Sequence, residues 1–428
     1  MKKNIRVFQT QSEYDTFISG DDVLRPNVSY VRGENEVHYN PKPDYSKQYL
    51  TFEALESGTF KFGKTIDYSL DNGTTWTTLE ANTASPTVVQ GDKILWRGQI
   101  SSYGTFSSTA NYNVEGNIMS LLYGDNFANQ TELPNGSYTF YSLFYGNTRL
   151  ISAVNMVLPA TTLRDKCYNE MFKGCTSLTT APNELPATTL AVDCYNSMFN
   201  GCTALTTAPT LPATTLASQC YYYMFVGCTS LTTAPELPAT TLAVYCYSNM
   251  FANCKSLTTA PELPATTLAQ YCYQYMFAGC TNLTSLDISG FNTANVANMS
   301  YMFSYCQNLG SLNLSNLNLQ SVTTMAGMFS HCGVQTLNLS GATTSSALNN
   351  ATSMFSYCEN LSGTLDLSGI ELSTIINWWN KFDIFGNAAT NGSLTVLCTQ
   401  NTYNALNDGH SSDYGLAGNN HITLQVVE

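Results

Sequence analysis

A 26-residue period runs through more than half of the chain and constrains its fold more than any other feature. The pair Met-Phe recurs with one step of 27 residues and six of 26, at Met171-Phe172, Met198-Phe199, Met224-Phe225, Met250-Phe251, Met276-Phe277, Met302-Phe303, Met328-Phe329 and Met354-Phe355. A cysteine follows each pair three residues later. Such periods indicate a stack of small units, none of which buries its apolar face alone. We therefore expect a long, repetitive surface of the kind that binds partners.

The chain divides into four segments by its local patterns. We expect an extended N-terminal arm over residues 1–45, a β-sandwich of immunoglobulin-like type over 46–125, a solenoid over 138–385 and a β cap over 386–428. Within the second segment, Asp71-Asn72-Gly73 predicts a hairpin turn between strands at 66–70 and 75–79. The expected fold class is therefore an α+β repeat protein: a solenoid preceded by a small all-β sandwich.

The repeat beginning at Leu190 shows how one unit is expected to fold. Apolar residues recur every four positions, at Leu190, Cys194, Met198 and Cys202. This stripe predicts a short helix, and Gly201 marks its end. Residues 205–208 then read as extended, and Pro209 prevents further helix. Each unit is predicted to be strand, turn and helix, with its strand paired to the same strand in its neighbours.

The fourteen cysteines fit a buried ladder better than a disulfide framework. Thirteen of them occupy fixed repeat positions, and pairs such as Cys194 and Cys202 are eight residues apart. On a helix that spacing is roughly 12 Å along the axis, too far for a disulfide. Metal binding is the alternative, but the chain has no CxxC pair and no histidine at the repeat spacing. Reduced cysteine is a small, easily buried residue, so we expect a core role.

Composition excludes several classes of partner. The chain carries a net charge of −13 with only 11% charged residues, which argues against nucleic acid and anionic membranes because both require a positive surface. It has no apolar run near 18 residues, so we expect no membrane insertion. Residues 1–10 include Lys2 and Lys3 but no apolar stretch follows, so we expect no secretory signal.

The repeats resemble the BspA-like leucine-rich repeats of bacterial surface proteins. The match is close at 286–309, which reads Leu-x-Ile-Ser-Gly, then Met-Ser-Tyr-Met-Phe and Cys-x-x-Leu. Earlier repeats replace the first motif with Leu-Pro-Ala-Thr-Thr-Leu, which occurs five times from Leu158 to Leu263. The resemblance implies a leucine-rich-repeat solenoid, adhesion at a cell surface, and protein or glycan binding without catalytic residues.

A second resemblance concerns the N-terminal third. The arm and the β-module, with Leu50-Thr51-Phe52 and residues 68–76, look similar to virion proteins of phages that infect gut Bacteroides-type bacteria. This resemblance implies a virion-associated protein, made in the host cytoplasm, whose residues 1–125 attach to other virion proteins. It also explains a surface-type repeat without an export signal.

The sequence offers little support for catalysis. Ser69, Asp71, Gly73, Thr75 and Trp76 fit the Asp-box pattern of sialidases, in which the box is a folding hairpin rather than a catalytic site. The four histidines have no recurring partner. A pair of catalytic carboxylates, as in glycoside hydrolases, is not excluded by the sequence, but no arrangement of acidic residues favours it. No phosphate loop, dinucleotide fingerprint or calcium loop is present. We therefore expect a protein that is not an enzyme, with no cofactor and no metal.

Tyrosines at the variable repeat positions are the candidate binding residues. They are Tyr222, Tyr223, Tyr245, Tyr271, Tyr275, Tyr301 and Tyr305. Tyrosine offers contact area with a polar tip and loses little entropy on binding. The alternative is packing against neighbouring repeats, which we expect for tyrosines at the constant position beside cysteine: Tyr168, Tyr195, Tyr221, Tyr247 and Tyr273.

The sequence thus predicts a non-enzymatic binding protein. Our main interpretation is a phage virion protein whose repeats recognise a protein or glycan of the bacterial host surface. The first alternative is a bacterial cell-surface adhesin, and the second is a structural virion component. The sequence leaves open whether the chain forms a homo-oligomer. It also leaves open whether the concave or the convex face of the solenoid binds the partner.

Overall fold

The computed structural model describes residues 44–100, 104–134, 136–265, 268–286, 293–315 and 317–427, and the backbone of three earlier strands. Contacts divide the chain into two units, Met1–Tyr45 and Ser46–Glu428. In the first unit, β1 (Asn4–Phe8) pairs in parallel with β2 (Val28–Arg32), which pairs antiparallel with β3 (Asn35–Val37). The arm expected over 1–45 thus contains a three-stranded sheet; its other residues lie outside the described part.

The second unit begins with a β-sandwich. Its strands are β4 (Leu50–Ala54), β5 (Phe60–Phe62), β6 (Ile66–Ser69), β7 (Thr77–Leu79), β8 (Lys93–Arg97), β9 (Phe106–Ser108) and β10 (Tyr112–Asn117). The larger sheet runs in the order β11-β10-β4-β8-β6-β7, and β5 pairs with β9. Aromatic rings fill the space between, with Phe52 4.8 Å from both Phe106 and Tyr112 between ring centroids.

The predicted hairpin is confirmed, and its polar side chains bond within the turn itself. β6 and β7 pair antiparallel, and Asn72 and Gly73 take the positive φ values that such a turn requires. Both Asp71 oxygens accept hydrogen bonds from Thr75, from its backbone N at 2.8 Å and its Oγ1 at 2.6 Å. The Trp76 indole donates to the Gly73 carbonyl at 3.1 Å. The motif therefore stabilises its own turn.

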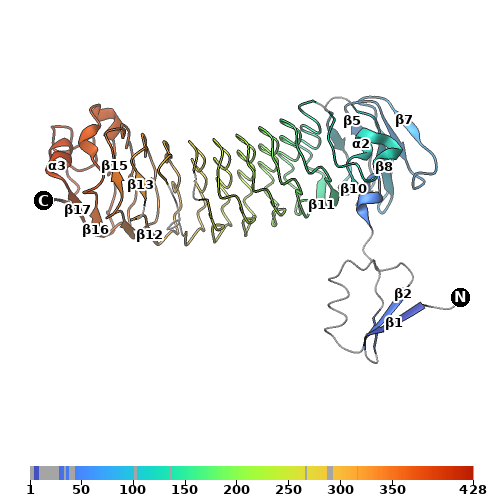
Figure 1. Cartoon of the computed structure of the whole chain (residues 1–428), viewed down its shortest axis with the longest axis horizontal. Coiled ribbons are helices and arrows are strands. Elements are labelled where there is room, and N and C mark those ends of the chain that lie inside the picture. Colours follow the sequence, from blue (N-terminus) through green and yellow to red (C-terminus); the bar gives the residue numbers. More distant parts are fainter. Residues whose placement is uncertain are drawn as a thin grey trace. The chain divides into compact units, whose positions relative to one another are not determined.

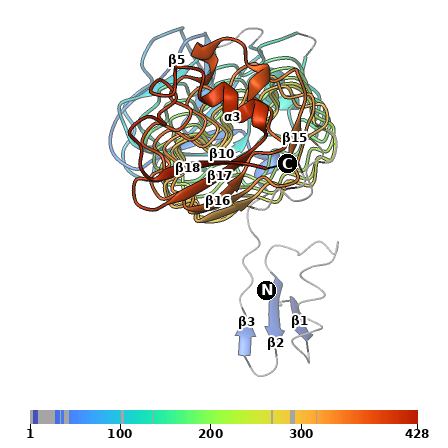
Figure 2. The ribbon, with the colours of Figure 1, turned by 90° about the vertical axis from the view of Figure 1, so that its left-hand side faces the viewer.

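The sandwich continues into the repeats without a break in packing. β10 pairs in parallel with β11 (Leu150–Val157), a strand of the first repeat, and a short helix, α2 (Ser120–Tyr123), lies between them in the chain. One apolar cluster extends from Leu50 to Tyr414. Figure 1 shows the coils following one another along the second unit, and Figure 2 shows them superimposed when viewed from the end.

The described residues of the repeats contain no α-helix, only the short 3-10 helices η3 (Leu372–Thr374) and η4 (Trp378–Lys381) near the C-terminal end, so the strand-turn-helix prediction was wrong in its last element. Between Ala191 and Cys202, alternate N–H groups close four-residue turns, as from Cys194 to Ala191 O and from Met198 to Tyr195 O, at 3.3 and 3.2 Å. The N–H groups between them donate to the next coil, as from Tyr195 to Cys220 O at 3.0 Å. Each coil is therefore a row of tandem turns bonded sideways to its neighbour.

Strand pairing between repeats is confirmed, in two forms. In the first repeats it is reduced to single parallel bridges, such as Thr180 to Thr207 and Thr207 to Thr233. Later repeats have true strands: β12 (Ser311–Asn313), β13 (Asn318–Leu319), β14 (Thr336–Asn338), β15 (Thr343–Thr344) and β16 (Gly363–Asp366). β12 pairs with β14, and β13 with β15, in parallel. The expected strand at 286–289 lies mostly outside the described residues.

The C-terminal segment covers the open end of the stack. β16 pairs in parallel with β17 (Leu394–Cys398), which pairs with β18 (Ile422–Val426), while α3 (Gln400–Leu406) lies between the last two in the chain. Both β17 and β18 lie in the segment 386–428, where the sequence predicts a β cap. Thr399 caps α3 by accepting a hydrogen bond from the backbone N of Thr402 at 3.1 Å.

Three ladders of identical side chains hold the coils together. The Met-Phe phenylalanines stack from one repeat to the next, with Phe172 and Phe199 5.3 Å apart and nearly parallel. Tyr195 and Tyr221 stack in the same way at 5.8 Å, so the constant tyrosines do pack inside as predicted. The thiols complete the core: Cys202 Sγ donates to the Phe172 carbonyl at 3.1 Å, and equivalent bonds recur along the stack. All fourteen cysteines are free and buried.

Candidate binding surface

The tandem turns place one residue in four in the left-handed conformation. In the repeat at 191–202 these residues are Asp193, Ser197 and Gly201, with φ between 56 and 77°. Each occupies the third position of a four-residue turn, where a type II turn requires positive φ. The same three positions recur in neighbouring repeats and form three columns along the solenoid.

We number the columns by their order in the repeat. Column 1 contains Tyr138, Lys166, Asp193, Gln219, Tyr245 and Tyr271. Column 2 contains Ser142, Glu170, Ser197, Tyr223, Asn249, Tyr275, Tyr301, Gly327, Ser353 and Asp383. Column 3 contains Gly146, Gly174, Gly201, Gly227, Asn253, Gly279, Tyr305, His331, Tyr357 and Asn387. Tyrosines gather in the middle repeats of columns 1 and 2, and column 2 then returns to Gly327 and Ser353; column 3 becomes aromatic from Tyr305 to Tyr357. The tyrosine-rich variable positions thus belong to these columns rather than to a helix face.

Six of the seven predicted binding tyrosines lie in the columns. Tyr245 and Tyr271 stack in column 1 with centroids 4.5 Å apart, and Tyr275 and Tyr301 stack in column 2 at 4.8 Å. The seventh, Tyr222, precedes column 2 and meets Tyr223 edge to face at 4.1 Å. Tyr222, Tyr223, Tyr245, Tyr271, Tyr275 and Tyr301 are half-buried, whereas Tyr305 is exposed.

Tyrosine is a costly choice at these positions. A left-handed backbone costs an L-residue other than glycine about 1–2 kcal/mol, and a stacked ring pair returns about 0.5–1.5 kcal/mol. The two terms nearly cancel, so folding alone gives no reason to prefer tyrosine to glycine or asparagine there. Gly327 makes room for one of the rings, because a Cβ at that position would collide with Tyr301.

The phenols of Tyr222, Tyr245 and Tyr275 are neutral hydrogen-bonding groups. Burial raises the pKa of Tyr222 above its usual value, and a hydrogen bond with Tyr223 raises it further. Burial likewise raises the pKa of Tyr245 and of Tyr275. Because the stacked rings cover one another's faces, the columns present ring edges and hydroxyl groups to a partner.

Column 3 extends beyond the predicted set. His331 lies between Tyr305 and Tyr357, with centroids 4.3 and 4.4 Å away and rings nearly parallel. The sequence placed these three residues at one repeat position, directly before the cysteine, but Tyr357 was left out of the candidates. Burial lowers the pKa of His331, so its ring is neutral at pH 7.

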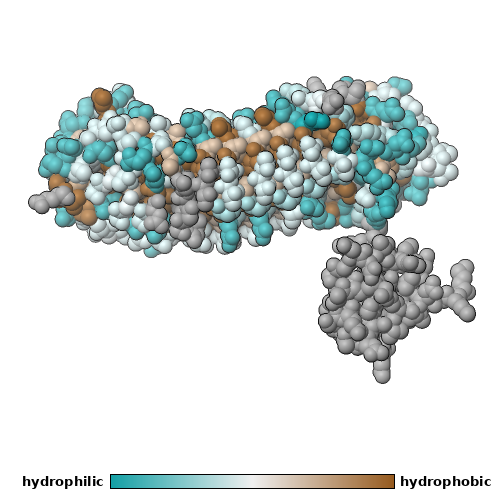
Figure 3. Space-filling view, viewed as in Figure 1, coloured by the Kyte–Doolittle hydropathy of each residue, from teal (hydrophilic) through white to brown (hydrophobic). Residues whose placement is uncertain are grey.

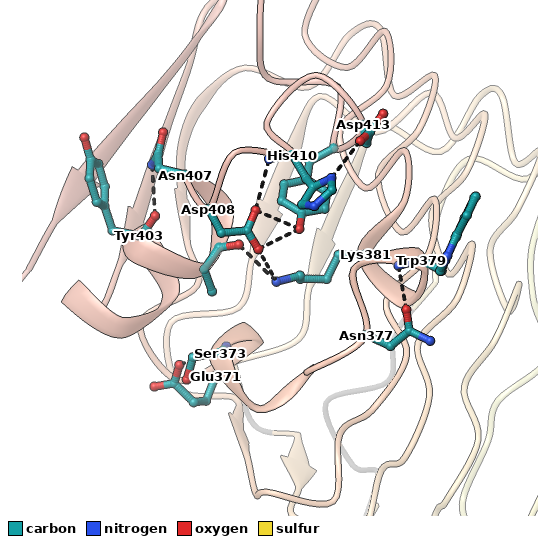
Figure 4. Close-up of polar contacts among 12 residues, drawn as sticks. Glu371, Ser373, Asn377, Trp379, Lys381, Tyr403, Asn407, Asp408, His410 and Asp413 are labelled. Carbon is teal, nitrogen blue, oxygen red and sulfur yellow. Dashed lines mark hydrogen bonds and ion pairs between the residues drawn. The ribbon is translucent and has the colours of Figure 1, made fainter.

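A second exposed aromatic group was missed at the C-terminal end. The step from Phe355 to the stacked Phe385 is 30 residues instead of 26, and the extra residues fall near Ile376 and Trp379, which are 96% and 59% exposed. This 30-residue step was the signal in the sequence that could have identified the exposed group. Beside them, buried Lys381 donates to the Ala405 carbonyl at 3.0 Å and faces Asp408 at 3.5 Å. Figure 4 shows Trp379 pointing away from this polar cluster.

The described residues offer neither a metal cluster nor an activated thiol among the cysteines of the repeats. They contain no group of three His, Cys, Asp or Glu side chains placed to hold a metal ion. Burial raises the pKa of the Cys167, Cys220 and Cys272 thiols to about 12, so they are protonated and poor nucleophiles. Among the same residues, no helix is long and apolar enough to cross a membrane.

The surface of the repeats is weakly polar. Figure 3 shows pale and brown residues over the middle of the solenoid on the visible face, with more hydrophilic residues toward both ends of the second unit. This distribution fits the low charge content of the chain, and it favours contact through aromatic, threonine and amide groups over ion pairing.

Two repeat families match overlapping parts of the chain. Residues 136–274 match the BspA type leucine-rich repeat region, in 6 copies. Residues 246–368 match a family described as Mycoplasma protein of unknown function, DUF285. Neither is a catalytic domain. No curated protein and no solved structure shows a significant match.

Proposed function

We propose that this protein is a cell-surface adhesin whose solenoid binds a protein or glycan through the tyrosine columns. The BspA-type repeats support a surface and binding role. The observation that carries the proposal is the placement of Tyr223, Tyr245, Tyr271 and Tyr275 at left-handed positions. Other repeats use mainly charged or small polar residues there, such as Lys166 and Asp193 in column 1 and Ser197 and Asn249 in column 2. Residues held in strained conformations without a gain in stability are often functional.

The chemistry of the columns suits adhesion. Stacked rings are rigid, so binding them costs little conformational entropy. The side chains of a column repeat once per coil, so a partner that extends along the solenoid can make many weak contacts at the same time. Attachment to a phage particle, with residues 1–125 bound to other virion proteins, stays a prediction that no observation here favours over a bacterial cell surface.

Binding of the labelled full-length chain to intact bacterial cells tests the proposal. We expect saturable binding that falls at least tenfold in the double variant Tyr245→Asn/Tyr271→Asn. Asparagine tolerates the left-handed backbone, so the fold is retained. Pretreating the cells with protease or with periodate distinguishes a protein partner from a glycan.

Tyr145→Asn is the matched control. Tyr145 is 48% exposed but lies outside the three columns, so binding should be unchanged in this variant. The proposal is wrong if the double variant binds as well as the unchanged chain, or if no binding saturates.

A further inference from the structure

One repeat of column 3 has a shortened turn. After Cys332 the chain reaches the buried Val334 in two residues, whereas the preceding repeat takes three, from Cys306 to Leu309. The longer turn is closed by a hydrogen bond from Leu309 N to Cys306 O, at 3.2 Å. Gly333 N instead crosses to the carbonyl of Cys306 at 3.1 Å. The missing residue therefore changes the local bonding.

The shortened turn leaves a pocket between its two neighbours. The pocket has a volume of about 230 Å³ and is open to solvent, and its lining includes Gln307, His331, Gly333, Tyr357, Glu359 and Asn360. Gln307 and Glu359 occupy the position after the cysteine in the flanking repeats, where this repeat has Gly333. A Cβ at Gly333 would collide with the Gln307 carbonyl, so no side chain can close the gap.

Neighbouring contacts position the polar groups of the pocket. The Asn360 side-chain oxygen accepts a hydrogen bond from Asn391 Nδ2 at 2.9 Å. His331 Nδ1 lies 3.0 Å from Ser330 Oγ, and its ring is fixed between two tyrosines. The pocket thus combines two amides, one carboxylate and a neutral imidazole beside an aromatic wall.

This set of groups selects the class of ligand. The side-chain amides and the neutral imidazole of the pocket each offer both a hydrogen-bond donor and an acceptor. They therefore match the hydroxyl groups of a sugar, each of which can donate and accept. Phosphate is disfavoured, because the lining has no lysine or arginine and the chain is acidic overall. The pocket is smaller than the ~300–1,000 Å³ typical of drug-sized ligands, so a single ring suits it.

We propose that the pocket formed by the short turn at Gly333 binds one uncharged sugar residue. Gln307, Glu359 and Asn360 hydrogen-bond its hydroxyl groups, and Tyr357 and His331 contact its carbon skeleton. This site is separate from columns 1 and 2 and does not depend on their role in adhesion.

Saturation-transfer NMR of the full-length chain with glucose, galactose, mannose and N-acetylglucosamine tests the proposal. We expect at least one sugar to bind, with its dissociation constant raised at least tenfold in Glu359→Ala and in Gln307→Ala. Both residues are exposed, so neither substitution disturbs the core. The matched control is Thr281→Ala, which changes the same turn position where no turn is shortened.

The outcomes separate this site from its alternatives. Binding that persists in Glu359→Ala and Gln307→Ala, or no binding by any of the four sugars, overturns the proposal. So does Glu359-dependent binding of choline without sugar binding, since that would identify a site for an organic cation. Tyr245→Asn/Tyr271→Asn should bind the sugars normally, so failure of the adhesion proposal would remain distinguishable.

Discussion

At the scale of single residues, backbone conformation explains which side chains the columns carry. Glycine populates positive φ freely, which accounts for Gly174, Gly201, Gly227 and Gly279 in column 3. In later repeats Tyr305, His331 and Tyr357 take the same conformation and offset its cost by stacking on one another. The residue at each column position is therefore set by a balance between backbone strain and ring contact.

Gly227→Ala measures the cost of the left-handed backbone directly. Gly227 has φ of 71°, and an added Cβ would lie 4.0 Å from Gly201 Cα, an ordinary contact. We expect a loss of about 1–2 kcal/mol in the free energy of unfolding, from backbone strain alone. Urea unfolding checks this value.

Gly310→Ala is the control for that substitution. Gly310 has no positive φ, and a Cβ there would meet no atom within 4 Å. We expect its stability to be unchanged or slightly higher, because alanine has less freedom in the unfolded chain. Equal losses in the two variants would contradict the assignment of strain to the columns.

At the scale of elements, the hairpin of β6 and β7 depends on an ionised carboxylate. Asp71 accepts hydrogen bonds from the backbone and the hydroxyl of Thr75 and from the hydroxyl of Ser69. These bonds favour the charged form and lower the pKa of Asp71 to about 2. The turn is therefore sensitive to acid.

The lowered pKa predicts how the hairpin responds to pH. A folded value near 2, below the unfolded value of about 3.9, means that the stabilisation is complete above the unfolded pKa and is lost as the pH falls through about 2. Asp71→Asn should therefore melt at a lower temperature than the unchanged chain at pH 7. The two melting temperatures should converge near pH 2, and a constant difference would show that the charge of Asp71 has no part in it.

At the scale of the whole molecule, the stack is stabilised by contacts between neighbouring repeats. The Phe and Tyr rings of the ladders stack on their counterparts about 26 residues away, and Cys202 Sγ donates to the Phe172 carbonyl of the preceding coil, so much of the packing lies between coils. The sandwich and the C-terminal strands cover the two ends, as solenoids require for solubility.

Thiol reactivity tests this core as a whole. All fourteen cysteines are free and buried, so an aromatic disulfide reagent should label almost none in the folded chain and all fourteen after unfolding in urea. A reductant should leave the melting temperature unchanged. Fast labelling of several thiols, or a lower melting temperature with reductant, would contradict the buried ladder.

The sequence by itself determined the repeat length, the buried ladders, the pairing of like strands and the abundance of tyrosine at the variable positions. These follow from periodicity, since a side chain that recurs at a fixed spacing meets its own copies in a stack. Only the tertiary structure decided between helix and tandem turns. A stripe such as Leu190, Cys194, Met198 and Cys202 fits a short helix locally, although its strict spacing of four drifts around a helix of 3.6 residues per turn.

The deciding interactions lie in the neighbouring coil. Alternate N–H groups, such as those of Tyr195 and Phe199, donate to carbonyls of the next repeat and not to their own segment. The pocket at Gly333 arises in the same way, from one short turn between two longer ones. Partners about 26 residues apart leave no local signal in the sequence, so the turns and the pocket became visible only in the assembled stack.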